Sequence, residues 1–173
     1  YGLVGSEMCI RDRLYIMRHG KTEWNALHKI QGRTDIPLNE EGRLMAEKAC
    51  EEYKDLHIDV CYCSPLIRAV ETAQIVLKNR KIPIIKDERL MEMSFGDYEG
   101  IENSFAIPDC PINILFQKPG EYHESIGGAE TWEELFARTG ASFSFTMIGT
   151  ISSGSAARTR SSEPCLLYTS DAA

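Results

Sequence analysis

Short apolar segments alternate with segments whose apolar residues recur at helical spacing, and this alternation restricts the fold more than any other feature. The apolar run Leu14–Met17 predicts a buried strand that ends in a loop at residues 18–20. Residues 58–63 and 82–85 predict two further strands, the last with Pro83 near its start.

Two amphipathic helices are expected between these strands. Asn39 with the acidic residues after it predicts a helix start, and the helical spacing continues to about Leu56. Ser64 and Pro65 predict the N-cap and first residue of a second helix that reaches Leu77. The order strand, helix, strand, helix, strand predicts an α/β three-layer sandwich with a mostly parallel sheet, with ligands at the carboxyl ends of the strands.

The pattern weakens after Gly100. Residues 101–126, which include three prolines, predict an irregular insertion over the site. Residues 130–138 predict a new helix that begins at a capping sequence.

Composition excludes several classes of partner. The 173 residues have a formal net charge of -7, which disfavours nucleic acid and anionic membranes as partners. The six cysteines form neither a CxxC pair nor a dense secreted framework. With no recognisable secretory signal, the sequence predicts buried, reduced thiols in a cytoplasmic protein.

Chemistry is concentrated where the first expected strand ends, at Arg18-His19-Gly20. An arginine guanidinium offers parallel hydrogen bonds to phosphate oxygens, and a neutral imidazole can take up a phosphoryl group covalently. Gly20 leaves the backbone free to approach a ligand. By itself, however, this triplet also fits an ordinary surface histidine.

A functional role for this histidine is indicated by three motifs that follow one another along the chain: LYIMRHGKTEWNALHKIQGRTDIPLNEEGRLMA, SPLIRAVETA and ERLMEMSFGDYEG. Together they resemble the histidine phosphatase superfamily (phosphoglycerate mutase-like proteins) over residues 14–138. The resemblance implies that His19 is the nucleophile and that Arg18, Asn25 and Arg68 bind the phosphoryl group. It implies no metal and no cofactor.

The resemblance also implies that Glu92 is the proton donor. The ester oxygen is a poor leaving group unless it receives a proton while the P–O bond breaks. A carboxyl group in the right position can donate that proton. Glu99, in the Asp97–Gly100 stretch, is interpreted as structural, and Gln31-Gly32-Arg33 as a turn.

The domain organisation departs from the family pattern. Residues 1–13 and 165–173 resemble translated sequencing adapters, residues 14–139 form a partial histidine phosphatase domain, and residues 140–164 fit either a linker or a frameshifted reading. A second histidine, which the family carries in a later Ser/Ala-His-Gly motif, has no counterpart after Thr139. We therefore expect the C-terminal part of the fold to be missing and this polypeptide to be weakly active or inactive.

Three functions remain open from the sequence. The first is a phosphomonoesterase that acts on small phosphorylated metabolites through a phosphohistidine. The second is phosphoglycerate mutase-type phosphoryl transfer, and the third is a non-catalytic phosphate-binding domain. The sequence leaves the substrate and the oligomeric state undetermined.

Overall fold

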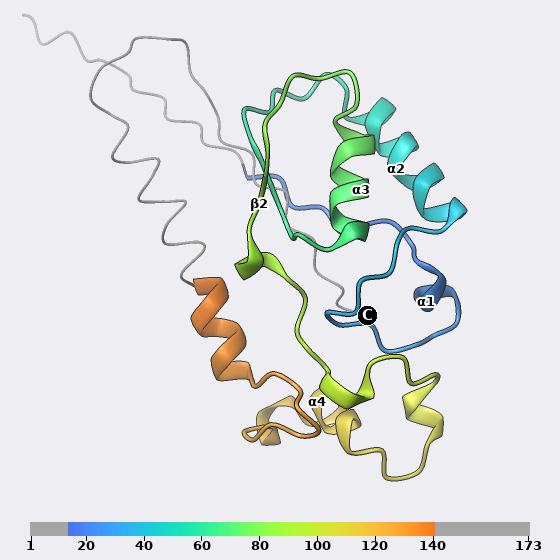
Figure 1. The fold of residues 1–173 in the computed structure, drawn as a ribbon, viewed down its shortest axis with the longest axis vertical. Coiled ribbons are helices and arrows are strands. Elements are labelled where there is room, and N and C mark those ends of the chain that lie inside the picture. Colours follow the sequence, from blue (N-terminus) through green and yellow to red (C-terminus); the bar gives the residue numbers. More distant parts are fainter. Residues whose placement is uncertain (1–13, 141–173) are drawn as a thin grey trace, which may run out of the picture.

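A computed structural model describes residues 14–140 (Figure 1). The segments interpreted above as tails, and residues 141–164, lie outside the described residues. The described elements are α1 (Glu23–Ala26), α2 (Glu40–Glu52), β1 (Cys61–Cys63), α3 (Ile67–Val76), β2 (Ile84–Lys86) and α4 (Ile114–Gln117). Residues 132–140 form a further helix, and several single 3-10 turns connect the rest.

The sheet confirms the predicted parallel pairing. β1 and β2 run parallel, with Cys61 opposite Ile84 and Cys63 opposite Lys86. Pro83 stands just before β2 and contributes its carbonyl, which accepts a hydrogen bond from the Cys61 N–H at 3.0 Å. A proline is tolerated there because the ladder needs only its carbonyl.

Helix α3 packs against this sheet, and α2 lies beside α3 (Figure 1). Their small apolar residues, Ala46 and Ala73, pack with Cys61, Cys63 and Val76 in one buried cluster. Asn39 caps α2 as predicted, because its Oδ1 accepts from the Gly42 N–H at 2.8 Å.

Several predicted elements differ from the structure. The strands expected at 58–63 and 82–85 are Cys61–Cys63 and Ile84–Lys86, and the first helix ends at Glu52 and not near Leu56.

The strand expected at residues 14–17 is absent. Residues 14–17 are irregular backbone, and Leu14 and Ile16 are 52% and 60% exposed. An apolar run becomes a strand only where another strand offers a hydrogen-bonding edge, and among residues 14–140 none pairs with it.

Helix α3 begins at Ile67 and not at Pro65. Ser64 Oγ accepts from the Leu66 N–H at 3.3 Å, which closes a turn before the helix. The N–H of Ile67 is satisfied from elsewhere in the chain, by Asp35 Oδ1 at 2.6 Å. The cap is therefore supplied by a residue that local sequence reasoning does not associate with this helix.

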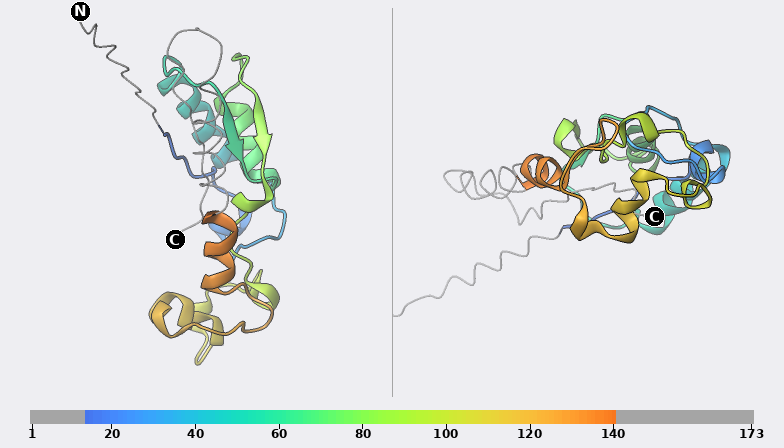
Figure 2. Two further views of the ribbon diagram at one scale, coloured as in Figure 1. Left: turned by 90° about the vertical axis from the view of Figure 1, so that its left-hand side faces the viewer. Right: turned by 90° about the horizontal axis from the view of Figure 1, so that it is seen from below.

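A second apolar cluster lies in the part of the molecule formed from Met93 onward. It is built from Met93, Phe95, Ile112, Leu115 and Tyr122, among others. This part consists of α4 and short 3-10 turns, which confirms the predicted irregular segment, and it lies at the opposite end from α2 and α3 (Figure 2). Within residues 14–140, no helix is long and apolar enough to cross a membrane.

Candidate active site

His19 is buried, 7% exposed, at the end of the first irregular segment. Its Nδ1 lies 2.6 Å from the carbonyl oxygen of Gly20, which can only accept a hydrogen bond. Its Nε2 lies 3.1 Å from Nε of Arg68, which can only donate. These two neighbours assign the proton to Nδ1 and leave a lone pair on Nε2, the state that a nucleophile needs.

The loop that carries His19 is held from two sides. The Gly20 N–H donates to Thr72 Oγ1 of α3 at 3.1 Å, and the same hydroxyl donates to the Arg68 carbonyl at 2.7 Å. A Cβ on Gly20 would lie 2.5 Å from the carbonyl oxygen of Gly42 in α2. Gly20 is therefore needed for close packing against α2, a different role from the ligand approach predicted from the sequence.

Arg68 is almost completely buried, at 1% exposed, in the first turn of α3. Besides contacting His19, it donates from Nη1 to the Thr34 carbonyl at 3.1 Å and from Nη2 to the Gly32 carbonyl at 2.7 Å. One guanidinium thus connects the candidate nucleophile to the loop at residues 32–34.

Gln31, 5% exposed, extends this arrangement. In the amide orientation that satisfies its neighbours, its oxygen accepts from Nε and Nη1 of Arg68 at 3.1 Å and its nitrogen donates to Thr22 Oγ1 at 2.6 Å. Thr22 in turn caps α1 in a capping box with Asn25. A continuous chain of hydrogen bonds therefore runs from Asn25 to Arg68.

Arg18 and Asn25 line a common cleft of about 1190 Å³. Gln31 also contributes to its lining. Phe105 and Phe116 form an aromatic wall of the same cleft, with ring centroids 5.6 Å apart. The cleft thus combines cationic and amide donors with an apolar surface.

Glu92 belongs to a separate segment that follows the 3-10 turn Glu88–Leu90. Its carboxylate is half-buried and accepts from the Met93 N–H at 2.8 Å. Its carbonyl accepts from Arg33 Nε at 3.4 Å. Because Arg68 holds the carbonyls on both sides of Arg33, the loop at 32–34 connects the Glu92 segment with His19.

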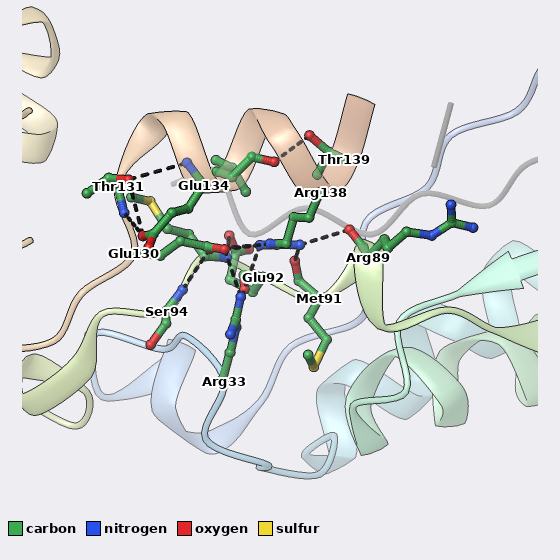
Figure 3. A network of polar contacts seen from close by, with 12 residues as sticks. Arg33, Arg89, Met91, Glu92, Ser94, Glu130, Thr131, Glu134, Arg138 and Thr139 are labelled. Atoms are coloured by element: carbon green, nitrogen blue, oxygen red, sulfur yellow. Dashed lines mark hydrogen bonds and ion pairs between the residues drawn. The ribbon is translucent and has the colours of Figure 1, made fainter. Parts of the chain in front are cut away.

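Figure 3 shows the polar network beside Glu92. Glu130, 8% exposed, accepts from Arg138 Nε at 2.6 Å and from Arg33 Nη2 at 2.8 Å. Burial opposes its ionisation, but the hydrogen bond and charge of Arg138, with the charge of Arg33, prevail and lower the pKa of Glu130. Glu130 is therefore a buried carboxylate between two guanidinium groups.

Glu99 is structural, as predicted. It accepts from the N–H groups of Arg33 at 2.9 Å, Thr34 at 2.7 Å and Phe95 at 3.1 Å, and from the Thr34 hydroxyl. Burial opposes its ionisation, and these hydrogen bonds outweigh it, so the pKa of Glu99 is lowered.

The structure thus brings His19 into contact with Arg68. Arg18 and Asn25 line the neighbouring cleft, whose lining residues within 14–140 do not include His19, Arg68 or Glu92. Glu92 is connected to this region through its backbone carbonyl, which accepts from Arg33.

Sequence reasoning missed four contributors: Gln31, Arg33, Glu130 and Arg138. The first two were assigned to a turn, and the other two to a helix. Most of their partners lie far away along the chain, so no local pattern in the sequence marks them.

The cysteines also agree with the sequence interpretation. All four in the described part of the chain are free, and Cys61, Cys63 and Cys110 are buried. Within residues 14–140, no cluster of three or more histidine, cysteine, aspartate or glutamate side chains is arranged to hold a metal ion.

Comparison with known proteins identifies the family. The model of the histidine phosphatase superfamily (branch 1) matches residues 14–146. The chain belongs to this superfamily. Its three motifs, its buried histidine and its parallel α/β sheet all lie within the matched histidine phosphatase region.

Curated relatives include both phosphatases and mutases. A protein named uncharacterized phosphatase PhoE from Bacillus subtilis is 42% identical over 99 residues, 57% of this chain and 51% of its own length. A 2,3-bisphosphoglycerate-dependent phosphoglycerate mutase from Gloeobacter violaceus is 44% identical over 128 residues, 69% of this chain and 53% of its own. This histidine phosphatase chain therefore spans about half the length of these relatives.

A solved structure supports the fold assignment. Bacillus stearothermophilus YhfR superposes with a TM-score of 0.73 at 32% identity, over 90% of this chain and 72% of its own. The α/β fold class expected from the sequence is thereby confirmed for this histidine phosphatase.

Proposed function

We propose that this protein is a phosphomonoesterase that cleaves small phosphorylated metabolites through a phosphohistidine on Nε2 of His19. The observation that carries the proposal is the pair of contacts on the imidazole, Gly20 carbonyl at Nδ1 and Arg68 at Nε2. This pair directs the unprotonated nitrogen toward a guanidinium that would hold a phosphoryl oxygen.

The remaining residues have complementary roles in the proposed reaction. Nε2 of His19 attacks phosphorus while Arg18, Asn25 and Arg68 bind the phosphoryl oxygens. The P–O ester bond breaks, and Glu92 gives its proton to the departing oxygen. Water then attacks the phosphohistidine, with Glu92 as the base, and inorganic phosphate is released.

The cleft supports hydrolysis over mutase-type transfer. Phosphoglycerates are small and carry a carboxylate beside their phosphate, whereas much of this cleft wall is apolar, with Phe95, Phe105 and Phe116 among its lining residues. An ester with an apolar alcohol part gains favourable burial there. Conversion of 3-phosphoglycerate to its 2-isomer would instead support the mutase.

We also propose a cytoplasmic location and partners limited to small phosphorylated substrates. The free thiols of Cys50, Cys61, Cys63 and Cys110 support a reducing compartment. The net charge of -7 supports the absence of nucleic-acid and anionic-membrane partners.

The test is direct detection of the phosphoenzyme. The purified chain is mixed with p-nitrophenyl phosphate, quenched in alkali, and its phosphohistidine, which is labile in acid, is located by mass spectrometry. We expect the label on His19, and its loss in His19→Ala. The trapped intermediate reports the first chemical step directly, whatever the rate of steady turnover.

His57→Ala is the matched control, because His57 is an exposed histidine with 68% of its side chain accessible. It should label as the parent protein does. A label on another residue, or binding of phosphate without any label, would contradict the proposed function, and the second result would favour a phosphate-binding domain.

A further inference from the structure

In the segment before Glu92, the N–H groups of Leu90 and Met91 donate within the 3-10 turn, whereas the carbonyls of Arg89, Met91 and Glu92 accept from side chains. Its 3-10 turn ends at Leu90, and residues 91–95 belong to no helix or strand. The carbonyls of such a segment need donors from elsewhere, because a buried carbonyl without a partner is costly. The conformation of this segment therefore depends on what supplies those donors.

One guanidinium supplies them. Arg138 Nη1 donates to the carbonyls of Arg89 at 2.8 Å and Met91 at 2.6 Å, and Nη2 donates to the carbonyl of Glu92 at 3.1 Å. Figure 3 shows Arg138 reaching these carbonyls from the helix at residues 132–140. The Arg138 side chain thus connects three carbonyls of the backbone that leads to Glu92.

Arg138 is itself held by Glu130. The carboxylate accepts from Arg138 Nε at 2.6 Å and Nη2 at 2.9 Å, a bidentate contact that restricts the guanidinium plane. Glu130 is anchored to the same segment, since its N–H donates to the Ser94 carbonyl at 2.8 Å. The helix at 132–140 begins beside it, with Thr131 and Glu134 in reciprocal capping contacts.

Arg33 closes the arrangement from the other side. Its Nη2 donates to Glu130 and its Nε to the Glu92 carbonyl. The carbonyls of its neighbours, Gly32 and Thr34, accept from Arg68, which contacts His19. The loop at residues 32–34 is therefore hydrogen-bonded to the Glu92 segment through Arg33, and to Arg68, which contacts His19.

We propose that Arg138, Glu130 and Arg33 form a positioning clamp that sets the carboxyl group of Glu92 against the ester oxygen that His19 displaces. This inference rests on the proposed function, because positioning Glu92 matters for catalysis only if Glu92 is the proton donor. Arg138, Glu130 and Arg33 are positioning residues: they act on the backbone and not on the substrate. Proton transfer is sensitive to such positioning, since the donor must lie within hydrogen-bond reach of its acceptor.

The test compares two esters with the same ring and different leaving groups. Nitrophenolate leaves readily without a proton, whereas phenolate depends more strongly on protonation. The rate of alcohol release is measured for p-nitrophenyl phosphate and phenyl phosphate with the parent protein, Arg138→Met, Glu92→Gln and the double variant. We expect Arg138→Met to lower the phenyl phosphate rate about tenfold more than the nitrophenyl rate, a loss within the general-acid contribution.

The double variant gives the second criterion. If Arg138 acts through Glu92, Arg138→Met adds little ester discrimination once Glu92→Gln is present. Should Arg138→Met fail to fold, Arg138→Lys retains one charge beside Glu130 but does not span three carbonyls. Its expected effect has the same direction and a smaller size.

Two controls isolate positioning from general destabilisation. Glu130→Gln removes the charge that holds Arg138 and should discriminate between the esters in the same direction as Arg138→Met. Glu133→Gln makes the same chemical change at an exposed position of the helix and should leave both rates unchanged. Val76→Ala, in the buried cluster with Ala46 and Ala73, lowers stability far from the clamp and should affect both esters equally.

The outcomes separate the two hypotheses. Equal losses on both esters in Arg138→Met, with discrimination retained in Glu92→Gln, would overturn the clamp and leave the proposed function intact. Absence of discrimination in Glu92→Gln would overturn the assignment of Glu92 and the clamp with it. Absence of any His19-dependent release would overturn the proposed function.

Discussion

The two ends of the Asn25 amide have different roles: the oxygen is structural, and the NH₂ group is proposed to bind phosphate. Its Oδ1 accepts from the Thr22 N–H at 3.0 Å and from Thr22 Oγ1 at 2.9 Å, which completes the cap of α1. These contacts use the amide oxygen, and the NH₂ group is the part of the side chain that can donate. Since Asn25 lines the cleft, that group is suited to a phosphoryl oxygen.

Asn25→Asp separates the two roles. The aspartate keeps an oxygen for both Thr22 contacts, so the unfolding midpoint should change little. It replaces the donor with a negative charge, so we expect KM for p-nitrophenyl phosphate to rise by about ten- to a hundredfold, the cost of a lost charge-assisted hydrogen bond plus repulsion. Thermal denaturation and steady-state kinetics together check this, and an unchanged KM would remove Asn25 from the phosphate site.

At the scale of elements, the decisive contact is between the loop after His19 and the start of α2. The Lys21 carbonyl accepts from the Asn39 N–H at 3.0 Å, and Thr22 forms a bridge with Leu38. A Cβ on Gly42 would lie 2.1 Å from the Lys21 carbonyl oxygen. Helix α2 thus serves as the surface on which the nucleophile loop rests.

Gly42→Ala should disturb that surface. Both colliding groups are backbone, so the loop has to move, and we expect a loss of about 1–3 kcal/mol in the free energy of unfolding. His19 would move with the loop, so phosphohistidine formation should slow as well.

Gly120→Ala is the matched control, because nothing lies within 4 Å of a Cβ there. Its unfolding free energy should change by less than about 0.5 kcal/mol. Urea titration of both variants measures the difference. Equal stability of the two would show that the Gly42 contact is easily relieved.

At the scale of the whole molecule, Glu99 and Glu130 connect segments distant in sequence, and both have lowered pKa values. Glu99 ties residues 33–34 to Phe95, and Glu130 ties Arg33 to Arg138. A carboxylate whose pKa is lower in the folded state than in the unfolded state binds fewer protons when folded. It stabilises the fold above its unfolded pKa, and that contribution is lost as the pH falls through its folded pKa.

We therefore expect stability to fall on acidification below the ordinary glutamate pKa of 4.5. Glu99→Gln should cost about 2 kcal/mol near pH 7, where its hydrogen bonds are to a charged group. The difference from the parent protein should shrink as the pH falls below 4.5, because the unfolded carboxylate then takes up a proton, and it should be lost once the pH passes below the lowered pKa of the folded carboxylate. Urea unfolding at several pH values checks both, and a difference independent of pH would contradict the role of the charge.

Much of the architecture and of the site follows from sequence patterns. Period and capping indicated α2, and the alternation of strands and helices indicated the parallel pairing of β1 with β2. Thr131 and Glu134 form the cap of the helix expected at 130–138. The motif resemblance selected His19, Arg18, Asn25, Arg68 and Glu92 as candidates. Such features are readable because a helix period, a cap or a motif involves residues close together in the chain.

Tertiary structure decided what depends on distant partners. It placed Asp35 at the start of α3, left residues 14–17 unpaired with β1 and β2, and assigned the proton of His19 through Gly20 and Arg68. It also joined Arg33, Glu130 and Arg138, which are separated by up to 105 positions yet share one carboxylate. The physical reason is that a hydrogen bond or a buried charge needs a partner within about 3 Å in space, whatever the separation along the chain.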